Sequence, residues 1–170
     1  KDANEFFRNM MISNLYGSYN RQRVAPDSLK RNIIDAIENE IEKVKSGSPG
    51  YILMKANSLT ERSIIDKLSE ASCAGVEINL IIRGICCILP GIEGYTENIR
   101  VFSLVGRFLE HHRVYMFGQK DERKIYIASA DIMTRNLARR VEIACPVLDP
   151  ELKSRIEHTA EVILSDNVKL

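Results

Sequence analysis

The chain has 170 residues, and its 24 Lys and Arg against 23 Asp and Glu leave a formal net charge of +1. This balance argues against bulk electrostatic attraction to nucleic acid or anionic lipid, although a local basic pocket remains compatible with it. Tryptophan is absent and aromatic residues make up 6% of the chain, so the composition does not favour recognition of stacked bases.

The first residue is Lys1 rather than Met, and residues 3–11 that follow have a helical pattern. We therefore expect the chain to be a piece of a longer protein. Residues 1–24 are predicted to lead in from a missing upstream domain, and residues 25–170 to form a domain of their own.

Three further segments have the apolar spacing of amphipathic helices. The first follows Pro26 and stops at Gly47, and the second begins near Ser58 or Thr60 and ends at Gly75. The third follows Pro150. The side chains expected to face inward are Leu29, Ile33, Ile34, Ile37, Ile41 and Val44 in the first, Ile64, Ile65, Leu68 and Ala71 in the second, and Leu152, Ile156, Ala160 and Ile163 in the third.

Short β-like runs lie between and after these helices. The run at residues 77–82 is apolar enough to be buried on both faces, and the run at 141–145 is expected to end at Pro146. The others span residues 51–55, 100–104, 112–117 and 124–128. This succession predicts an α/β layered domain, in which the long loop at 83–98 follows a strand at the sheet edge where ligands bind.

Two polar clusters and one arginine suit phosphate chemistry. Strand alternation predicts that His111, Arg113 and Tyr115 share one face, and that His112 lies on the opposite face with Val114 and Met116. Imidazole exchanges protons near neutral pH or attacks phosphorus, and guanidinium offers a fork of donors to phosphate oxygens. The same pattern is typical of the solvated side of an edge strand, and spacing alone favours that simpler interpretation.

The second cluster is Ser129–Asn136 with Arg139, Arg140 and Glu142, whose small residues at a strand end permit close approach of a ligand. Its alternative is a turn in which Asp131 and Asn136 act as caps. The arginine is Arg83, directly after a buried strand, where it suits an anion or a nearby carboxylate.

Four cysteines, Cys73, Cys86, Cys87 and Cys145, match no zinc spacing. We expect them to be reduced, buried thiols in a cytosolic protein.

Several long segments, in order, resemble the polyphosphate kinase family. Residues 81–91 (IIRGICCILPG) resemble its I-x-R-G-x-C-x-L-x-P-G motif, with Ile88 in place of leucine. Residues 105–115, 129–137 and 139–142 are similar to later motifs, as are 24–26, 55–59 and 146–149. One departure is Ile132, where relatives often carry Trp. Another is Ala56 in place of a larger apolar residue.

The resemblance implies a phospholipase D-like layered domain, with a mixed β-sheet flanked by helices. This domain would be the C-terminal part of a transferase that moves the terminal phosphoryl group of ATP reversibly to inorganic polyphosphate. The phosphohistidine of that phosphoprotein and its Mg²⁺ site would lie in the absent upstream domain, so that this chain binds no metal and is inactive in isolation.

The resemblance also assigns site residues by their motifs. It maps the second essential histidine, near the phosphates of the nucleotide, onto His111, and a nucleotide-contacting arginine onto Arg83. Arg113, Arg140 and Glu142 would complete the ATP and phosphate site. Whether His111 donates a proton to the leaving oxygen or positions the γ-phosphate stays open.

The implied partners are ATP, ADP, inorganic polyphosphate and the upstream domains, in a full-length homo-oligomer that does not bind nucleic acid. The implied location is the cytoplasm, with membrane association of the full-length enzyme as an alternative. One rival function is half of a phospholipase D-like phosphodiester hydrolase, because His111-x-Arg113 and residues 128–131 loosely echo that family's H-x-K and G-S-x-N elements. The other is a non-catalytic domain for phosphate binding or assembly.

Overall fold

The structure is a computed structural model that describes residues 2–12, 14, 19–26, 28–104 and 107–165. Its centre is a seven-stranded mixed sheet in the order β1-β7-β6-β5-β2-β3-β4. The strands β2, β3 and β4 are parallel to one another, whereas β5, β6, β7 and β1 each run antiparallel to their neighbour. The strand bounds are β1 Arg23–Ala25, β2 Tyr51–Ala56, β3 Glu77–Ile82, β4 Ile99–Phe102, β5 Arg113–Phe117, β6 Lys124–Ala128 and β7 Glu142–Val147.

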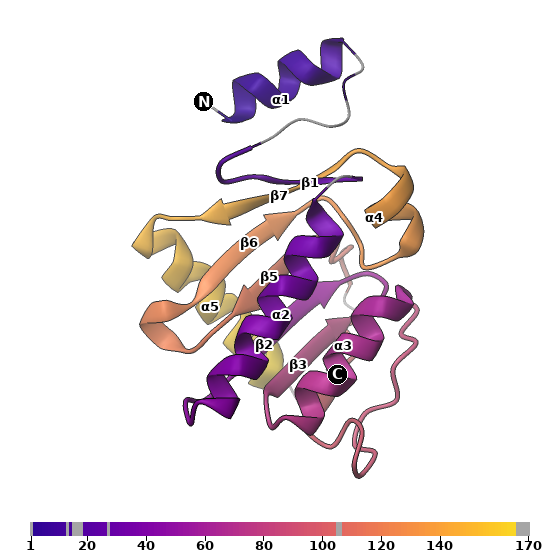
Figure 1. Cartoon of the computed structure of the whole chain (residues 1–170), viewed down its shortest axis with the longest axis vertical. Coiled ribbons are helices and arrows are strands. Elements are labelled where there is room, and N and C mark those ends of the chain that lie inside the picture. The colour runs from indigo at the N-terminus through magenta and orange to yellow at the C-terminus, as the bar shows by residue number, and fades with distance from the viewer. Residues whose placement is uncertain (1, 13, 15–18, 27, 105–106, 166–170) are drawn as a thin grey trace.

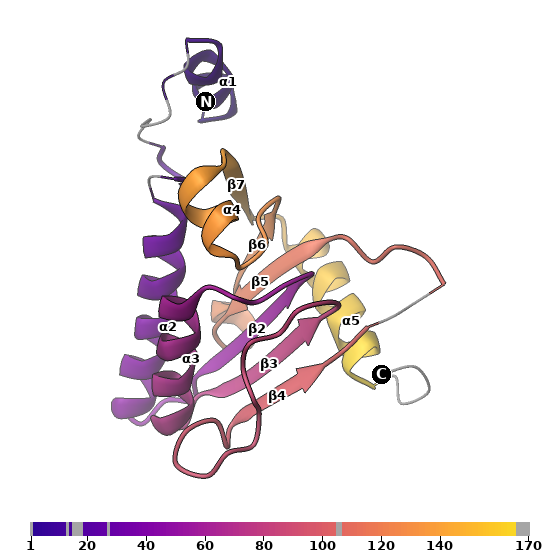
Figure 2. The ribbon, with the colours of Figure 1, turned by 90° about the vertical axis from the view of Figure 1, so that its right-hand side faces the viewer.

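Helices cover both faces of this sheet (Figure 2). The helices α2 (Leu29–Lys45) and α3 (Arg62–Cys73) pack on one face, and α5 (Pro150–Ser165) packs on the other. A short helix, α4 (Thr134–Arg139), lies near β1 and β7, and a 3₁₀ turn, η1 (Lys120–Glu122), connects β5 to β6. The N-terminal helix α1 (Asp2–Met11) lies beyond the β1–β7 side of the sheet and has no buried residue (Figure 1). The predicted α/β layered class is confirmed.

The larger core lies between the sheet and the pair α2 and α3. The four-residue spacing of Leu29, Ile33, Ile37 and Ile41 places all of them on the sheet-facing side of α2, where each is almost fully buried. The helix ends at Lys45 with Ser46 as its C-cap, and Gly47 follows with φ of +88°, a conformation that favours glycine. The smaller core, under α5, contains Leu53, Ile81, Val114, Met116 and Ala160.

The structure corrects four local predictions. Leu152 is 49% exposed, so of the four predicted side chains α5 turns Ile156, Ala160 and Ile163 toward the sheet but not Leu152. The strand β7 continues through Pro146, which pairs with Tyr126 of β6. The pairing of β1 with β7 covers only residues 142–144, so Pro146 lies where β7 is an edge strand and where its missing N–H leaves no sheet partner unsatisfied.

The other two corrections concern a helix start and the cysteines. The helix α3 begins at Arg62 rather than at residue 58 or 60, because residues 59–61 form backbone hydrogen bonds with Ile132 and with the loop that follows β3. All four cysteines are free, as expected, but Cys73 and Cys87 are exposed rather than buried. Val105 and Gly106, the first residues of the 105–115 motif, lie outside the described residues.

Candidate functional site

One edge of the sheet collects most of the predicted site residues. In the sheet register Arg113 pairs with Ala128, Ala128 pairs with Ala144, and the neighbouring Val114 pairs with Lys55. The ends of β2, β3 and β6 therefore meet the starts of β5 and β7. We call this the site edge; its residues are Asn57, Arg83, His111, Arg113, Asp131 and Glu142.

An ion pair between Arg113 and Asp131 lies at the middle of the site edge. The Arg113 Nη2 atom donates to Asp131 Oδ2 at 2.9 Å and Nε donates to Oδ1 at 3.2 Å, and both side chains are 12% exposed. Asn57 donates to the same Oδ1 from its backbone N at 2.7 Å and from Nδ2 at 3.2 Å. Residues from β5, from the loop after β6 and from the end of β2 thus share one carboxylate.

His111 lies on the solvent side of this ion pair. Its ring nitrogens Nδ1 and Nε2 are 3.2 Å and 3.3 Å from Nη1 and Nη2 of Arg113, and its carbonyl oxygen accepts from Nη1 at 3.1 Å. The imidazole is exposed. An exposed imidazole beside a fixed guanidinium is suited to an anionic, phosphate-bearing ligand.

The structure corrects the expected role of Tyr115. Its side chain is 1% exposed and belongs to the core beneath α2 and α3. Its hydroxyl donates to the carbonyl oxygen of Ala130 at 2.5 Å, and burial raises its pKa far above the usual range. The alternation that puts Arg113 and Tyr115 opposite Val114 and Met116 is confirmed, but helices cover both faces, so neither face is a solvated anion-binding surface below Arg113.

His112 faces a different set of partners from His111. Its Nδ1 is 3.2 Å from Glu110 Oε2, and it lines a cavity against Val114 and Met116, on the α5 side of the sheet. Burial lowers the pKa of His112, the charge of Lys55 lowers it further, and Glu110 raises it. The two adjacent histidines thus have different partners, as predicted, although both precede β5 rather than alternate within it.

Lys55 approaches the site edge from the α5 side. Its side chain is 4% exposed, and Nζ is 3.4 Å from the carbonyl oxygen of His112 and 3.7 Å from Glu110 Oε2. Burial lowers the pKa of Lys55; Glu110 raises it, and the charges of Arg83 and Arg113 lower it again. Three cationic side chains therefore lie close enough to affect one another.

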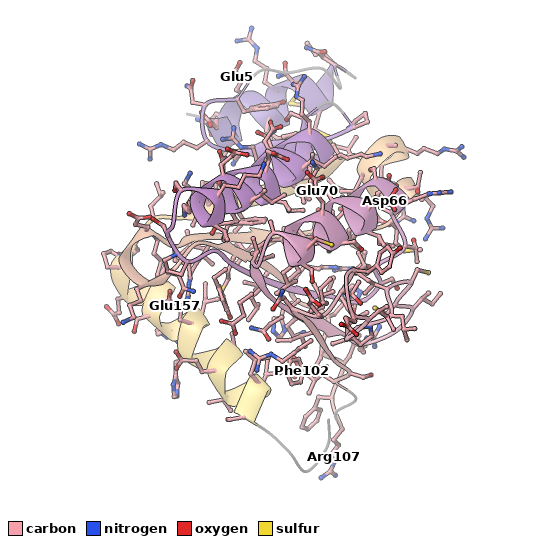
Figure 3. All side chains as sticks on the ribbon, turned by 60° about the horizontal axis from the view of Figure 1, so that its bottom comes forward. Glu5, Asp66, Glu70, Phe102, Arg107 and Glu157 are labelled. Atoms are coloured by element: carbon pink, nitrogen blue, oxygen red, sulfur yellow. The ribbon has the colours of Figure 1, made fainter. Side chains whose placement is uncertain are left out.

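Arg83 follows β3, as predicted, and its Nε atom is buried without a hydrogen-bond partner among the described residues. The backbone there remains paired with the end of β2, since the N–H groups of Arg83 and Gly84 donate to Ala56 and Asn57. An open pocket adjoins it, lined by Asn57, Ser58, Arg83, Gly84, Ile85, Arg107, Phe108 and Leu109. Arg107 extends from the connection between β4 and β5, away from the body of the domain (Figure 3). The free donor of Arg83 and the exposed charge of Arg107 suit a ligand with anionic oxygens.

The remaining two predicted residues differ in their settings. Glu142 is buried, and it accepts hydrogen bonds from Asn136 Nδ2 at 2.8 Å and from the hydroxyl of Ser129. Arg140 follows α4 and is exposed, and the structure gives its side chain no hydrogen bond or ion pair within the described part of the chain. Glu142 therefore organises the loop after β6, whereas Arg140 is free to contact a ligand.

Sequence reasoning did not select Lys55 and Asn57 as site residues, and it included Asp131 only in a polar cluster whose alternative was a turn cap. A signal existed for each of them: Lys55 is the only charge in a buried strand, and Asn57 and Asp131 follow strands directly. The local sequence pattern does not reveal the hydrogen bonds between Asn57 and Asp131, because the two residues are 74 positions apart.

The described residues contain no group of three or more His, Cys, Asp and Glu side chains that could hold a metal ion. The carboxylates of the site edge are already engaged, Asp131 by Arg113 and Asn57, and Glu142 by Ser129 and Asn136. These residues do not fit a Mg²⁺ site. Within the described ranges, no helix combines the length and the apolar composition needed to cross a bilayer.

Comparisons with known proteins agree with this geometry. The profile of the family "Polyphosphate kinase C-terminal domain 2" matches residues 23–170. The polyphosphate kinase of Bacillus cereus is 47% identical over 168 residues, which are 99% of this chain and 24% of that protein. The crystal structure of polyphosphate kinase from Porphyromonas gingivalis has a TM-score of 0.93 and 43% identity, covering 99% of this chain and 26% of that one.

A more distant structure, Nuc from Salmonella typhimurium, is a phospholipase D family member. It has a TM-score of 0.55 and 21% identity over 83% of this chain and 91% of that one, and it shows the fold alone. The fold is thus phospholipase D-like, as the resemblance implied. This chain spans about a quarter of the length of the polyphosphate kinases that it matches. The match of the family profile to residues 23–170, with 47% identity to a polyphosphate kinase across nearly the whole chain, establishes that the chain belongs to the polyphosphate kinase family as its C-terminal domain.

Proposed function

We propose that this domain forms one wall of the phosphoryl-transfer site of an ATP:polyphosphate phosphotransferase. In the full-length protein, the terminal phosphoryl group of ATP would move reversibly to inorganic polyphosphate through a phosphohistidine in an upstream domain. ATP, ADP and polyphosphate would be the substrates and products, and the upstream domains would supply the opposite wall. Membership of the family supports this assignment, as does the similarity of nearly the whole of this chain to named polyphosphate kinases.

The observation that carries the proposal is the position of His111 against Arg113 at the site edge, with Arg83 two strands away. Arg113 belongs to β5 and Arg83 follows β3, and β2 lies between them. At about 4.8 Å per strand, their backbones are roughly 10 Å apart across the edge. Two guanidinium groups and an exposed imidazole at one edge of the sheet suit a chain of phosphoryl groups better than a single monoanion.

Phosphoryl transfer requires little covalent work from the protein beyond alignment and neutralisation of charge on the transferring group. Arg83 and Arg113 would supply positive charge to the phosphate oxygens, and Arg140 would add to it from the end of α4. His111 would either protonate the leaving oxygen or hold the γ-phosphate in line. Glu142 would act indirectly, because it is buried and holds Ser129 and Asn136 of the neighbouring loop.

The Mg²⁺ ion that such transfers use would be held by the upstream domain, because the part of this chain that the structure describes does not fit it. No role of Arg83, His111 or Arg113 described above requires a metal ligand from this domain. We also propose a homo-oligomeric full-length enzyme in the cytoplasm that has no nucleic-acid substrate.

The proposal is tested in the full-length enzyme with His111→Ala, His112→Ala and Arg83→Ala, assayed in parallel with ATP and short-chain polyphosphate. His111→Ala should lower phosphoryl transfer at least about 100-fold, as expected for loss of a positioned acid or base. Arg83→Ala should mainly raise the KM for ATP, since a charged hydrogen bond contributes roughly 1.5–3 kcal/mol. His112→Ala is the matched control and should retain most of the activity, because His112 faces the α5 side.

An active His111→Ala enzyme together with an inactive His112→Ala enzyme would overturn the site assignment. The rival hydrolase function is tested on the 170-residue chain itself with a phosphodiester substrate. Hydrolysis that disappears in His111→Ala would favour the hydrolase over the kinase. A full-length protein that binds polyphosphate but transfers no phosphoryl group would favour the non-catalytic alternative.

A further inference from the structure

Asp131 is held by four hydrogen bonds in a nearly closed setting. Its side chain is 12% exposed, and it accepts from the backbone N and Nδ2 of Asn57 and from Nε and Nη2 of Arg113, at 2.7 to 3.2 Å. The two donors of Arg113 reach the two carboxylate oxygens separately, which is the forked geometry that fixes both the position and the plane of a guanidinium. Arg113 therefore cannot rotate freely while Asp131 is ionised.

The fixed plane of Arg113 in turn determines how it touches His111. The two terminal nitrogens of the guanidinium contact one ring nitrogen each, at 3.2 Å and 3.3 Å. The two nitrogens of an imidazole point to different sides of the ring, so one planar guanidinium cannot form in-plane hydrogen bonds with both at once. The guanidinium thus lies against the ring and leaves at least one ring nitrogen available to a ligand in its own plane.

From this chain of contacts we propose that Asp131 is a positioning residue for His111 and that it acts through Arg113. The inference rests on the proposed function, since it concerns the same phosphate site. Asp131 fixes the guanidinium, the guanidinium orients the imidazole, and the free ring nitrogen points toward the transferring phosphoryl group. Asp131 is not itself a ligand for phosphate, because its negative charge would repel one.

A purely structural role is the competing explanation, since an ion pair between β5 and the loop after β6 could simply hold that loop. The loop already has independent anchors. The hydroxyl of Tyr115 donates to the carbonyl oxygen of Ala130 at 2.5 Å, and the backbone N–H of Ile132 donates to the carbonyl oxygen of Ser58 at 3.1 Å. A mostly buried ion pair is also a poor source of stability compared with apolar packing. The contact of Arg113 with the exposed imidazole of His111 is what a loop anchor would not need.

The pKa shifts of Asp131 and Arg113 indicate that both groups stay charged, so that their ion pair persists. Burial by itself raises the pKa of Asp131, but the hydrogen bonds from Arg113 and Asn57 outweigh it and hold this pKa below the ordinary value for aspartate. The hydrogen bond with Asp131 raises the pKa of Arg113. Asp131 therefore stays ionised at neutral pH, and protonation does not break its ion pair with Arg113 there.

The test uses the full-length enzyme with Asp131→Asn, Arg113→Lys and the control Asp66→Asn, an exposed aspartate of α3. Asparagine preserves the shape of Asp131 but loses its charge, and lysine preserves the charge of Arg113 but loses its fork. Both site variants should lower kcat about 10- to 100-fold, the cost typical of a misplaced catalytic group. In Asp131→Asn the KM for ATP should change by less than about two-fold, because Asp131 does not contact the nucleotide and its loss affects alignment rather than affinity. Asp66→Asn should behave as wild type.

Two further measurements separate positioning from mere folding. In a His111→Ala background, Asp131→Asn should cost less than about two-fold more, because residues that act as a unit are non-additive. In the 170-residue chain, nuclear magnetic resonance should show the Arg113 Nε–H protected from exchange with solvent, and Asp131→Asn should abolish that protection while the backbone spectrum elsewhere is preserved. Equal losses of activity in both backgrounds, or an unchanged kcat in Asp131→Asn, would overturn the inference.

The two proposals fail in different ways. If His111→Ala leaves full-length activity intact, the proposed function of the site is wrong, whatever the spectra of the chain show. If His111→Ala is inactive and Asp131→Asn is fully active, the site assignment stands and only the positioning role is wrong.

Discussion

Lys55 is the only charged residue of β2, and its side chain is buried at the site edge. Its contacts to the carbonyl oxygen of His112 at 3.4 Å and to Glu110 at 3.7 Å are long for charge-assisted hydrogen bonds, which are normally 2.7–2.9 Å. Burial therefore removes the Lys55 ammonium from water, and its long contacts do not fully replace the lost hydrogen bonds to water. Lys55 lies between Arg83 and the segment that carries His111, so it adds positive charge to the site. Its burial lowers the stability of the fold.

We predict that Lys55→Met stabilises the isolated chain at pH 7. Burial lowers the folded-state pKa of Lys55, so between that value and the unfolded value of about 10.4 the unfolded chain binds more protons. The stability of the wild-type chain should rise with pH through that window. At pH 7 the variant should gain about 1 kcal/mol in free energy of unfolding, and the gain should shrink as the pH approaches 10.

Urea denaturation at several pH values measures this difference. The control is Lys124→Met, an exposed lysine at the start of β6, which should change stability by less than about 0.5 kcal/mol at each pH. A Lys55→Met chain that is less stable than wild type at pH 7 would show that the contacts of Lys55 outweigh its burial.

At the scale of elements, the connection between α2 and β2 depends on close contact at Gly50. A methyl group at this position would lie 2.9 Å from the carbonyl oxygen of Glu40, 2.9 Å from Val44 Cγ2 and 3.1 Å from Val76 Cγ2. The first of these atoms belongs to the backbone of α2 and cannot rotate away. Because α2 covers the larger core, any shift there also displaces the buried side chains of Ile37 and Ile41.

Gly50→Ala should therefore lower the free energy of unfolding by about 1–3 kcal/mol, the usual cost of overpacking. Ser48→Ala, at an exposed position two residues earlier, is the matched control and should be neutral within about 0.5 kcal/mol. Thermal or urea unfolding of the three chains measures the effect. A Gly50→Ala chain as stable as wild type would mean that α2 moves without cost to its packing.

At the scale of the whole molecule, the sheet order decides which residues form a site. Arg113 of β5 and Asn57 at the end of β2 are neighbours because β5 pairs antiparallel with β2, which itself pairs parallel with β3. The domain thus presents a complete edge of cationic and imidazole groups. On our proposal, that edge is only one wall of the catalytic site.

We predict that the 170-residue chain folds but has no kinase turnover alone. Both sheet faces carry their own cores, so cooperative unfolding should be seen by circular dichroism. The chain has three histidines, of which His112 faces the α5 side and His158 is exposed on α5, and neither is placed to replace an upstream phosphohistidine. Incubation with ATP should yield no polyphosphate. Synthesis by the chain alone would show that the upstream group is not required.

The sequence by itself determined most of the elements and the family. Apolar residues repeat along α2 with the period of a helix, and β3 is apolar throughout, so local order alone identifies both. The motifs around Arg83 and His111 likewise identified the family. Such inferences succeed because each depends on residues within one element or one loop.

The tertiary structure decided what contacts what. Tyr115 is polar at its tip, and only the packing of α2 and α3 over its side of the sheet makes it a core residue. Asp131 and Arg113 are 18 positions apart and Asp131 and Asn57 are 74 apart, so their shared hydrogen bonds depend on sheet order rather than on sequence spacing. In the sequence, a carboxylate after a strand is typical of a turn cap. Only the fold shows that a guanidinium binds it, because partners far apart in the chain produce no periodic sequence pattern.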